Sequence, residues 1–274
     1  MSFFKTTDGC SLYYEDLGFS SGKPVVVFLN GTMQTTLYWK VLADKFRNHF
    51  GVLLYDARSQ GASELGDSPL SLQGHIQDLM SLMDYLEIDK AHLVGVSHGA
   101  YVAYSLAAQS AHRVRRLVMC SVGAQSSFRS RLIVRSWLET LKTGGLDAAV
   151  WSTLPHVFGE TFLRRHANIL DRIVKSVVRR NNSEALQAHL TALLSYTPMS
   201  KSLKPLDRPL LVISGADDPL VTAEGALLIA RTCGGRHVKL QGVGHSIPAE
   251  APEIFTKTVV NFLTANYVEA PEGH

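Results

Sequence analysis

Residues 93–100 read LVGVSHGA, and this stretch decides the fold because an apolar run meets a helix-forming run at a serine between two glycines. The glycines on either side of Ser97 permit a sharp turn, since they have no Cβ to clash in a strained backbone. The turn would expose the Ser97 hydroxyl and place the backbone N–H of His98 at a helix N-terminus, where a developing negative charge is stabilised. The stretch therefore predicts a nucleophile elbow.

The composition is that of a chain with a large hydrophobic core. Of the 274 residues, 46% are hydrophobic and 19% are charged, with a net charge of +3. No basic run is interleaved with aromatic residues, which argues against nucleic-acid binding. The sequence shows neither a signal-peptide core nor a run of about 18 apolar residues, so we expect no membrane span. Three widely spaced cysteines favour the cytoplasm over a disulfide framework or a zinc site.

Apolar runs alternate with amphipathic segments on both sides of the elbow. The predicted strands include a hairpin within residues 3–17 and buried runs at 24–29, 51–56, 93–96, 114–120, 208–215 and 236–240. The predicted helices lie near residues 37–46, 71–86, 100–109 and 252–265. The alternation predicts an α/β fold, with a mostly parallel sheet covered by helices on both faces. Residues 269–274 look frayed.

The alternation stops between residues 125 and 205, where helical segments are punctuated by Gly and Pro and no buried strand is recognisable. The sequence thus predicts a core of residues 1–124 and 206–274 and a helical lid of residues 125–205. The lid has 12 Lys and Arg against 5 Asp and Glu, a formal charge of +7, whereas the remaining chain has 15 against 19. This excess is either a solvated cationic surface or a docking face for an anionic partner.

A nucleophilic serine needs a base, and the base needs an orienting carboxylate. Asp217 and Asp218 follow the strand at 208–215, and His245 follows the strand at 236–240. The carboxyl ends of parallel strands meet at one edge of an open α/β sheet, so these groups are expected close to Ser97. From the spacing alone, either aspartate can orient the histidine.

Polar loops also follow the first two buried strands. After the first, a glycine permits a tight turn that directs the backbone N–H of Thr32, or of Met33, toward Ser97 as an oxyanion donor. After the second, we expect Asp56 and Arg58 to hold the loop by hydrogen bonds and a charge pair. On the helix at 71–86, Ser71 is the expected cap, and His75 is expected to be a surface or packing residue.

These motifs together resemble the α/β-hydrolase superfamily from one end of the chain to the other. The matching segments are Gly95-Val96-Ser97-His98-Gly99, Asp56-x-Arg58-x-x-Gly61-x-Ser63, Gly215-x-x-Asp218, and Gly244-His245 followed by Glu250-x-Pro252. The resemblance implies an α/β-hydrolase fold with an inserted helical lid. It also favours Asp218 over Asp217, because the family places its acid three residues after the strand-ending glycine. The usual His-Gly of the oxyanion loop is Asn30-Gly31 here.

The activity implied by the resemblance is serine hydrolysis of a carboxylic ester or thioester through an acyl-enzyme. Ser97 would attack, His245 would take its proton, and Asp218 would orient the imidazole. The backbone N–H groups of Thr32 and His98 would bind the oxyanion, and the mechanism needs no metal or organic cofactor. The side chain of His98 is expected to line the site without acting as the base.

The lid is expected to select the substrate, a small acyl ester or thioester. Seven apolar lid residues are candidates for the wall of an acyl tunnel: Phe128, Leu132, Trp137, Trp151, Leu154, Phe158 and Phe162. The lid charge suggests an acyl group delivered on coenzyme A or on an acidic acyl carrier protein. The arginines expected to steer such a carrier are Arg164, Arg165, Arg179 and Arg180.

Two alternative functions remain open. The same triad can pass the acyl group to an alcohol, and Asn30-Gly31-x-Met33-x-Thr35-Thr36 resembles the loop of bacterial acyltransferases that assemble hydroxyacyl precursors of rhamnolipids. The chain can also be a non-catalytic ligand-binding member of the fold, since some members of the superfamily keep the triad and work by binding. Product analysis with a competing alcohol separates the first alternative from hydrolysis.

Overall fold

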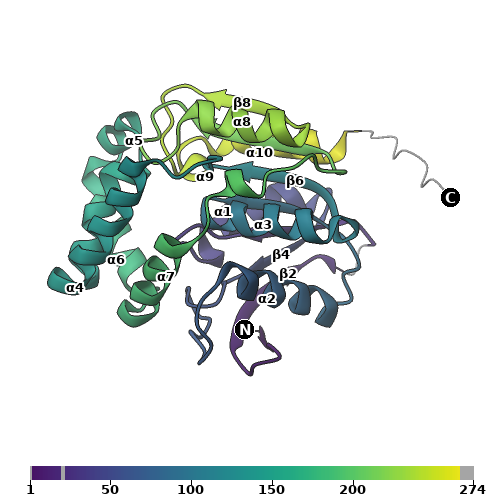
Figure 1. The fold of residues 1–274 in the computed structure, drawn as a ribbon, viewed down its shortest axis with the longest axis horizontal. Coiled ribbons are helices and arrows are strands. Elements are labelled where there is room, and N and C mark those ends of the chain that lie inside the picture. The colour runs from purple at the N-terminus through teal and green to yellow at the C-terminus, as the bar shows by residue number, and fades with distance from the viewer. Residues whose placement is uncertain (1, 20–21, 266–274) are drawn as a thin grey trace.

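Eight strands form a single sheet in the computed structural model, which describes residues 2–19 and 22–265 (Figure 1). The strands are β1 (Ser2–Lys5), β2 (Ser11–Leu17), β3 (Val25–Leu29), β4 (Gly51–Tyr55), β5 (Ala91–Val96), β6 (Val114–Cys120), β7 (Leu210–Gly215) and β8 (Arg236–Leu240). Their order across the sheet is β1-β2-β4-β3-β5-β6-β7-β8. Strand β2 pairs antiparallel with both β1 and β4, and the strands β3 to β8 run parallel to one another.

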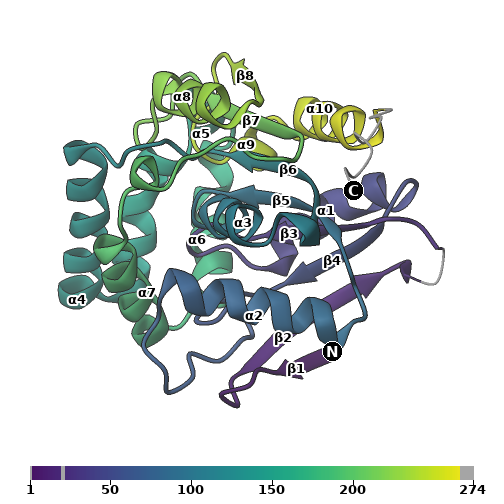
Figure 2. The same cartoon turned by 45° about the vertical axis from the view of Figure 1, so that its right-hand side comes forward.

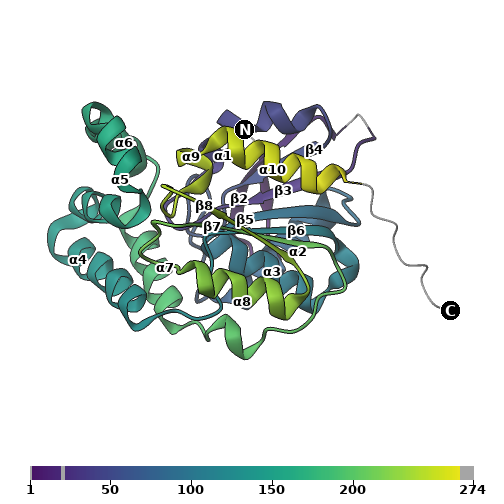
Figure 3. The same cartoon turned by 90° about the horizontal axis from the view of Figure 1, so that it is seen from above.

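Helices cover both faces of this sheet because its central strands are apolar on both sides. The helices α2 (Leu72–Tyr85), α3 (His98–Gln109) and α8 (Ala223–Cys233) pack on one face. The helices α1 (Thr36–Arg47) and α10 (Pro252–Thr264) cover the other face. Figure 3 shows the two groups of helices on opposite sides of the sheet. The hairpin of β1 and β2 extends the sheet at one edge (Figure 2).

Between β6 and β7 the described chain forms helices, turns and no strand, and we call residues 121–209 the helical insertion. Its helices are α4 (Phe128–Val157), α5 (Glu160–Arg165), α6 (Leu170–Val178) and α7 (Ser183–Ser195), and they stand to one side of the sheet (Figure 1). Gly145 interrupts α4 with a φ of 77°, a value that glycine adopts without strain. Leu141 on α4 and Leu190 on α7 belong to one apolar cluster, so the insertion has apolar clusters of its own.

The predicted architecture is confirmed, including the hairpin within residues 3–17 and the cap at Ser71, whose hydroxyl accepts from the backbone N–H of Gly74 at 3.0 Å. Helices α8 and α9 (Ile247–Glu250) were not among the predicted elements. Three short 3₁₀ turns complete the described chain, at Ala111–Arg113, Ala167–Ile169 and Met199–Lys201. The predicted frayed segment 269–274 lies outside the described residues. Within residues 2–19 and 22–265, no helix is long and apolar enough to cross a bilayer.

Buried His92 on β5 makes the stability of this fold depend on pH. Its side chain is 5% exposed, and burial, reinforced by Arg115 and Arg116, lowers the pKa of its imidazole to about 3. In the unfolded chain the pKa is about 6.5, so the unfolded state binds one more proton between these values and stability falls as the pH drops.

We expect the titration of His92 to lower the free energy of unfolding by about 2 kcal/mol when the pH is lowered from 7.5 to 5. Urea unfolding of the native chain and of His92→Gln at both pH values measures the difference. The substituted chain should lose less stability on acidification, because glutamine does not titrate. An equal loss in both proteins would contradict the assignment.

Candidate active site

Ser97 lies at the junction of β5 and α3 in a strained conformation. Its φ of 53° and ψ of −116° fall in a region that residues with a Cβ rarely adopt. The turn is held from both sides, because the Ser97 N–H donates to the carbonyl of Cys120 at 2.8 Å and the Ser97 carbonyl accepts from Tyr101 N–H at 3.1 Å. This geometry is that of the predicted elbow, with a partly exposed serine at the start of a helix.

The glycines beside the elbow are required for backbone packing. A Cβ on Gly95 would lie 2.5 Å from the carbonyl oxygen of Gly99, and a Cβ on Gly99 would lie 2.4 Å from the carbonyl oxygen of Leu29. Both contacts are with backbone, which cannot rotate away as a side chain can. The strand, the elbow and the neighbouring strand β3 therefore approach one another only where no side chain intervenes.

We expect Gly99→Ala to destabilise the protein by about 1–3 kcal/mol or more, the range typical of overpacking. The matched control is Gly225→Ala in the first turn of α8, where an added methyl meets its nearest atom at 3.4 Å. Alanine is the better helix former there, so the control should be neutral or slightly stabilising. Thermal unfolding of the two variants compares them, and equal stability would contradict the packing argument.

His245 is oriented by Asp218 at the carboxyl edge of the sheet. The Nδ1 atom of His245 lies 2.7 Å from Oδ2 of Asp218, and the two residues are 6% and 8% exposed. The other carboxylate oxygen, Oδ1, accepts from the backbone N–H groups of Leu220 at 2.8 Å and Val221 at 3.0 Å. Asp217 is exposed, so the structure brings Asp218 and not Asp217 to the histidine.

The carboxylate of Glu250 fixes the loop that carries His245. It accepts from the backbone N–H groups of Gly244 at 2.9 Å and Ser246 at 3.1 Å, and from that of Gly159 in the helical insertion at 2.9 Å. Burial raises the pKa of Glu250, and the three donors oppose that shift. The hydroxyl of Ser121 donates to the His245 carbonyl at 2.6 Å. No motif in the sequence predicted a separate role for Glu250 or Ser121.

The loop after β3 is held rigid around Gly31. The Gly31 N–H donates to Oε1 of Gln34 at 2.8 Å, and Nε2 of Gln60 donates to the Gly31 carbonyl at 2.9 Å. Among the described residues, no protein group accepts a hydrogen bond from the backbone N–H of Thr32 or of His98. Both are therefore available to a ligand in the cavity.

Asn30 replaces the usual histidine before Gly31 and is 2% exposed. Its amide donates to the carbonyl of Tyr55 at 3.1 Å and accepts from the indole N–H of Trp39 at 2.8 Å. Each polar atom of the buried side chain thus has a partner. The substitution preserves an anchored loop.

A cavity of about 600 Å³ brings the predicted site residues together, since Ser97, His245, Thr32 and His98 all line it. No hydrogen bond joins Ser97 to His245 among the described residues. In structures without substrate, catalytic hydrogen bonds are often long and tighten only in the complex. His98 is among the residues that line the cavity, and its Nε2 atom lies 3.4 Å from the Tyr196 hydroxyl.

Four of the seven apolar candidates line this cavity: Trp137, Leu154, Phe158 and Phe162. The expectation is wrong for Phe128, Leu132 and Trp151, which are 79%, 51% and 39% exposed and do not line it. The physical reason is that α4 turns one face toward the cavity and the core of the insertion and the other toward solvent. Further apolar walls come from α6 and α7, through residues such as Ile173, Val177 and Leu193.

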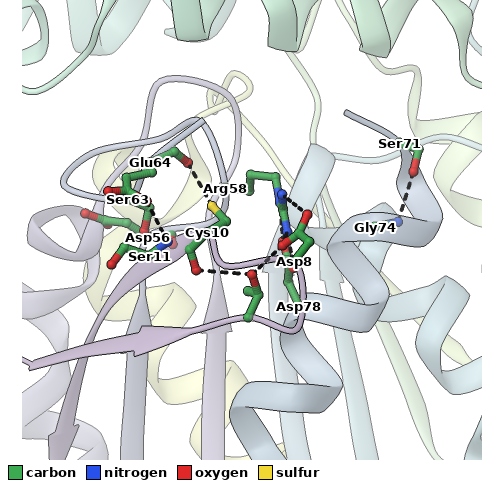
Figure 4. A network of polar contacts seen from close by, with 11 residues as sticks. Asp8, Cys10, Ser11, Asp56, Arg58, Ser63, Glu64, Ser71, Gly74 and Asp78 are labelled. Atoms are coloured by element: carbon green, nitrogen blue, oxygen red, sulfur yellow. Dashed lines mark hydrogen bonds and ion pairs between the residues drawn. The ribbon is translucent and has the colours of Figure 1, made fainter. Parts of the chain in front are cut away.

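Asp56 and Arg58 make the structural contacts expected of them. Asp56 accepts from the backbone N–H groups of Thr36 at 2.6 Å and Ala62 at 2.9 Å, and its burial raises its pKa. Arg58 is paired with Asp8 and Asp78 (Figure 4).

The four arginines proposed to steer a carrier differ in their surroundings. Arg164 pairs with Glu160 on the surface. Arg180 lines the cavity and donates to the backbone carbonyl of Ser176 at 2.7 Å. Arg165 and Arg179 are exposed, and no ion pair is found for either among the described residues, so their charges are not neutralised by a partner as that of Arg164 is.

The strained serine on an eight-stranded sheet, with an aspartate-bound histidine at the same edge, defines the class of the protein. The chain belongs to the alpha/beta hydrolase family, whose model matches residues 26–258.

Particular relatives refine the comparison. The chain is 26% identical, over 94% of its length and 97% of the relative's, to a protein of Caulobacter segnis provisionally named carbamate hydrolase RutD. The enol-lactonase of Burkholderia xenovorans is 28% identical, with a TM-score of 0.88 and coverage of 96% of this chain and 100% of that one. MGS-M2, an alpha/beta hydrolase enzyme from a Medee basin deep-sea metagenome library, is 25% identical with a TM-score of 0.91, covering 98% and 100%. The resemblance predicted from the motifs is confirmed, and these relatives are named as hydrolases.

Proposed function

We propose that the protein is a serine hydrolase that cleaves carboxylic esters, with Ser97, His245 and Asp218 as its catalytic triad. The observation that carries the proposal is the 2.7 Å contact of Asp218 with His245, because His245 lines the same cavity as a serine held on a strained turn. The fixed carboxylate keeps the proton on Nδ1 and leaves Nε2 as the base. This is the arrangement that activates a serine at neutral pH.

The proposed reaction has two halves. Ser97 Oγ forms a bond to the substrate carbonyl carbon while His245 takes the hydroxyl proton, and the resulting oxyanion accepts from the N–H groups of Thr32 and His98. The tetrahedral intermediate collapses, and His245 returns the proton to the departing alcohol. Water then attacks the acyl-enzyme with the same base, which releases the acid and regenerates Ser97.

The cavity supports a substrate with an apolar acyl part. Its walls include Trp137, Leu154 and Phe158 from the helical insertion. We therefore keep the division into a core of residues 1–124 and 206–274 and a lid of residues 125–205, in which the lid sets chain length. Relatives named as an enol-lactonase and a carbamate hydrolase favour ester-like carbonyl substrates. Thioesters remain part of the proposal, because the same attack cleaves them.

A basic docking face for an acidic acyl carrier is a second element of the proposal. It is supported by the +7 formal charge of residues 125–205 and by the exposure of Arg165 and Arg179. Charge reversal at both positions should lower kcat/KM for carrier-linked thioesters at low salt and leave small esters unaffected. An unchanged kcat/KM for the carrier-linked substrate overturns the proposed docking face but not the proposed ester hydrolysis.

The test of the proposed function is hydrolysis of 4-nitrophenyl esters of graded chain length, with added alcohol in a parallel series. Release of 4-nitrophenol together with free acid supports hydrolysis. Formation of a new ester with the alcohol identifies an acyltransferase, and tight ligand binding without turnover identifies a non-catalytic binder.

The described cysteines Cys10, Cys120 and Cys233 are free and buried, which suits the reducing cytoplasm that we propose as the location.

A further inference from the structure

Three histidines distant in sequence meet behind the nucleophile. His75 comes from α2, His98 is the first residue of α3, and His189 comes from α7 in the helical insertion. They are 3%, 3% and 2% exposed. One ring nitrogen of each lies within 4.8 Å of those of the other two, and the ring centroids of His75 and His189 are 4.7 and 4.6 Å from that of His98.

These buried imidazoles are short of hydrogen-bond partners. Among the described residues, neither ring nitrogen of His75 has one, and Nδ1 of His98 has none. The Nδ1 atom of His189 has only the Ser59 hydroxyl, at 3.5 Å. Buried polar atoms are nearly always paired, so a cluster of unpaired nitrogens calls for a ligand. Each histidine retains a nitrogen able to supply a bond to that ligand.

The opposite ring nitrogens of two of these histidines are oriented. Nε2 of His189 lies 3.1 Å from the Thr32 hydroxyl, and Nε2 of His98 lies 3.4 Å from the Tyr196 hydroxyl. In metal sites, a ligating imidazole commonly donates its second N–H to an oxygen, which fixes the ring and its tautomer. Thr32 and Tyr196 are placed to accept such bonds.

The charge state of the cluster suits a cation. Burial lowers the pKa of His75 to about 3 and that of His189 to about 4, and it lowers the pKa of His98 well below its ordinary value. The three rings are therefore neutral at pH 7 and present the lone pairs that a metal needs.

The surroundings of His75 offer a polar route to the cluster. Arg58 acts on His75, but it is paired with both Asp8 and Asp78, so this group of three side chains carries a net charge of −1 (Figure 4). A second cavity, of about 260 Å³, is lined by His75 together with the two aspartates. A hydrated cation would meet carboxylates before it reaches the histidines.

We propose that His75, His98 and His189 form a binding site for a divalent transition-metal ion of the Zn²⁺ class. Imidazole nitrogens are preferred ligands of Zn²⁺, Co²⁺, Ni²⁺ and Cu²⁺, whereas Mg²⁺ and Ca²⁺ prefer oxygen. Tetrahedral Zn–N bonds of about 2.0–2.1 Å place ligand nitrogens about 3.4 Å apart, so rotation of the rings has to draw them together. The site is independent of the proposed ester hydrolysis, which requires no metal.

The bound ion would join three elements at one point. Two of its ligands belong to helices packed on the sheet, and the third belongs to α7 of the helical insertion. His98 also follows Ser97 directly, so the ion would hold the insertion against the elbow. The role is that of a structural clip between the two parts.

The first test uses the full-length chain, stripped with a chelator and titrated with Co²⁺ at neutral pH. We expect one Co²⁺ per chain, with the strong visible bands of a four-coordinate site, and their loss when Zn²⁺ is added in equal amount. Failure of the native chain to bind either ion stoichiometrically would overturn the proposal, and this result requires no variant.

The second test compares His75→Gln, His189→Gln and the control His92→Gln. His92 is also buried and also has an unpaired Nδ1 atom, but it lies outside the cluster. Even outer-sphere partners contribute about 10–100-fold to metal affinity, so loss of a ligand should weaken Co²⁺ binding by at least about 100-fold. The control should bind as the native chain does. Circular dichroism verifies folding, and binding that survives both ligand substitutions overturns the proposal.

Discussion

Ser97→Ala is expected to reduce kcat for ester hydrolysis by on the order of 10⁴-fold or more, the loss typical of removing a serine nucleophile. The elbow holds the hydroxyl at the start of α3, next to the His98 N–H. Alanine fits the same backbone, so binding of the ester should persist while the acyl-enzyme no longer forms. Steady-state kinetics with the preferred 4-nitrophenyl ester measures the change.

Ser126→Ala is the matched control for this experiment, because Ser126 also lines the cavity and is exposed. Its activity should equal that of the native chain. A fluorophosphonate should add to the native protein and to the control, and mass spectrometry should place the adduct on Ser97. Equal activity of Ser97→Ala and the native chain would refute the assignment of the nucleophile.

Asp218→Asn is expected to lower kcat by about 10⁴-fold with little effect on folding. The amide oxygen can still accept from the N–H groups of Leu220 and Val221, which now bind Oδ1. The amide NH₂ group then faces Nδ1 of His245, however, and selects the tautomer that carries its proton on Nε2. A base protonated on Nε2 cannot take the proton of Ser97.

Asp217→Asn removes a neighbouring carboxylate without touching His245, since Asp217 is exposed. Its kcat should match that of the native chain, and both variants should unfold at nearly the native temperature. Comparable losses in the two variants would mean that general charge, and not the Asp218–His245 contact, sustains the activity.

The parallel core could be predicted from the sequence because its signals are local. An apolar run such as residues 25–29 specifies a strand buried on both faces, and the glycines around Ser97 specify the turn that follows the elbow strand. Asp218 was distinguished from Asp217 by the family spacing, and the structure supplies the physical reason in the N–H groups that hold its other oxygen. Helix α8, which was not predicted, also has local signals in the sequence: a cap at Thr222 and apolar positions such as Ala226 and Ile229.

The orientation of side chains in the helical insertion was harder to predict, because each helix faces three surroundings. One part of its surface packs on other helices, one lines the cavity and one contacts solvent. Phe128 and Trp151 are large and apolar, as residues in a tunnel wall are, but both lie on the face of α4 that is exposed to solvent. The histidine cluster was missed for a different reason. The rings of His75 on α2 and His189 on α7 lie 6.2 Å apart between centroids, and no spacing within the sequence encodes a contact between residues so far apart along the chain.

Exchange of the helical segment between members of this family has to respect one carboxylate. The carboxylate of Glu250 accepts from Gly244 in the histidine loop and also from Gly159, which directly precedes α5. A Cβ on Gly159 would lie 3.0 Å from both Glu250 Oε2 and the Gly244 nitrogen, so a larger residue in a grafted segment would press on the contacts that hold the histidine loop. A chimera that ignores this joint would misplace His245 even when its new cavity is well packed. Engineering of chain-length preference is therefore better directed at α6 and α7, which line the cavity away from this joint.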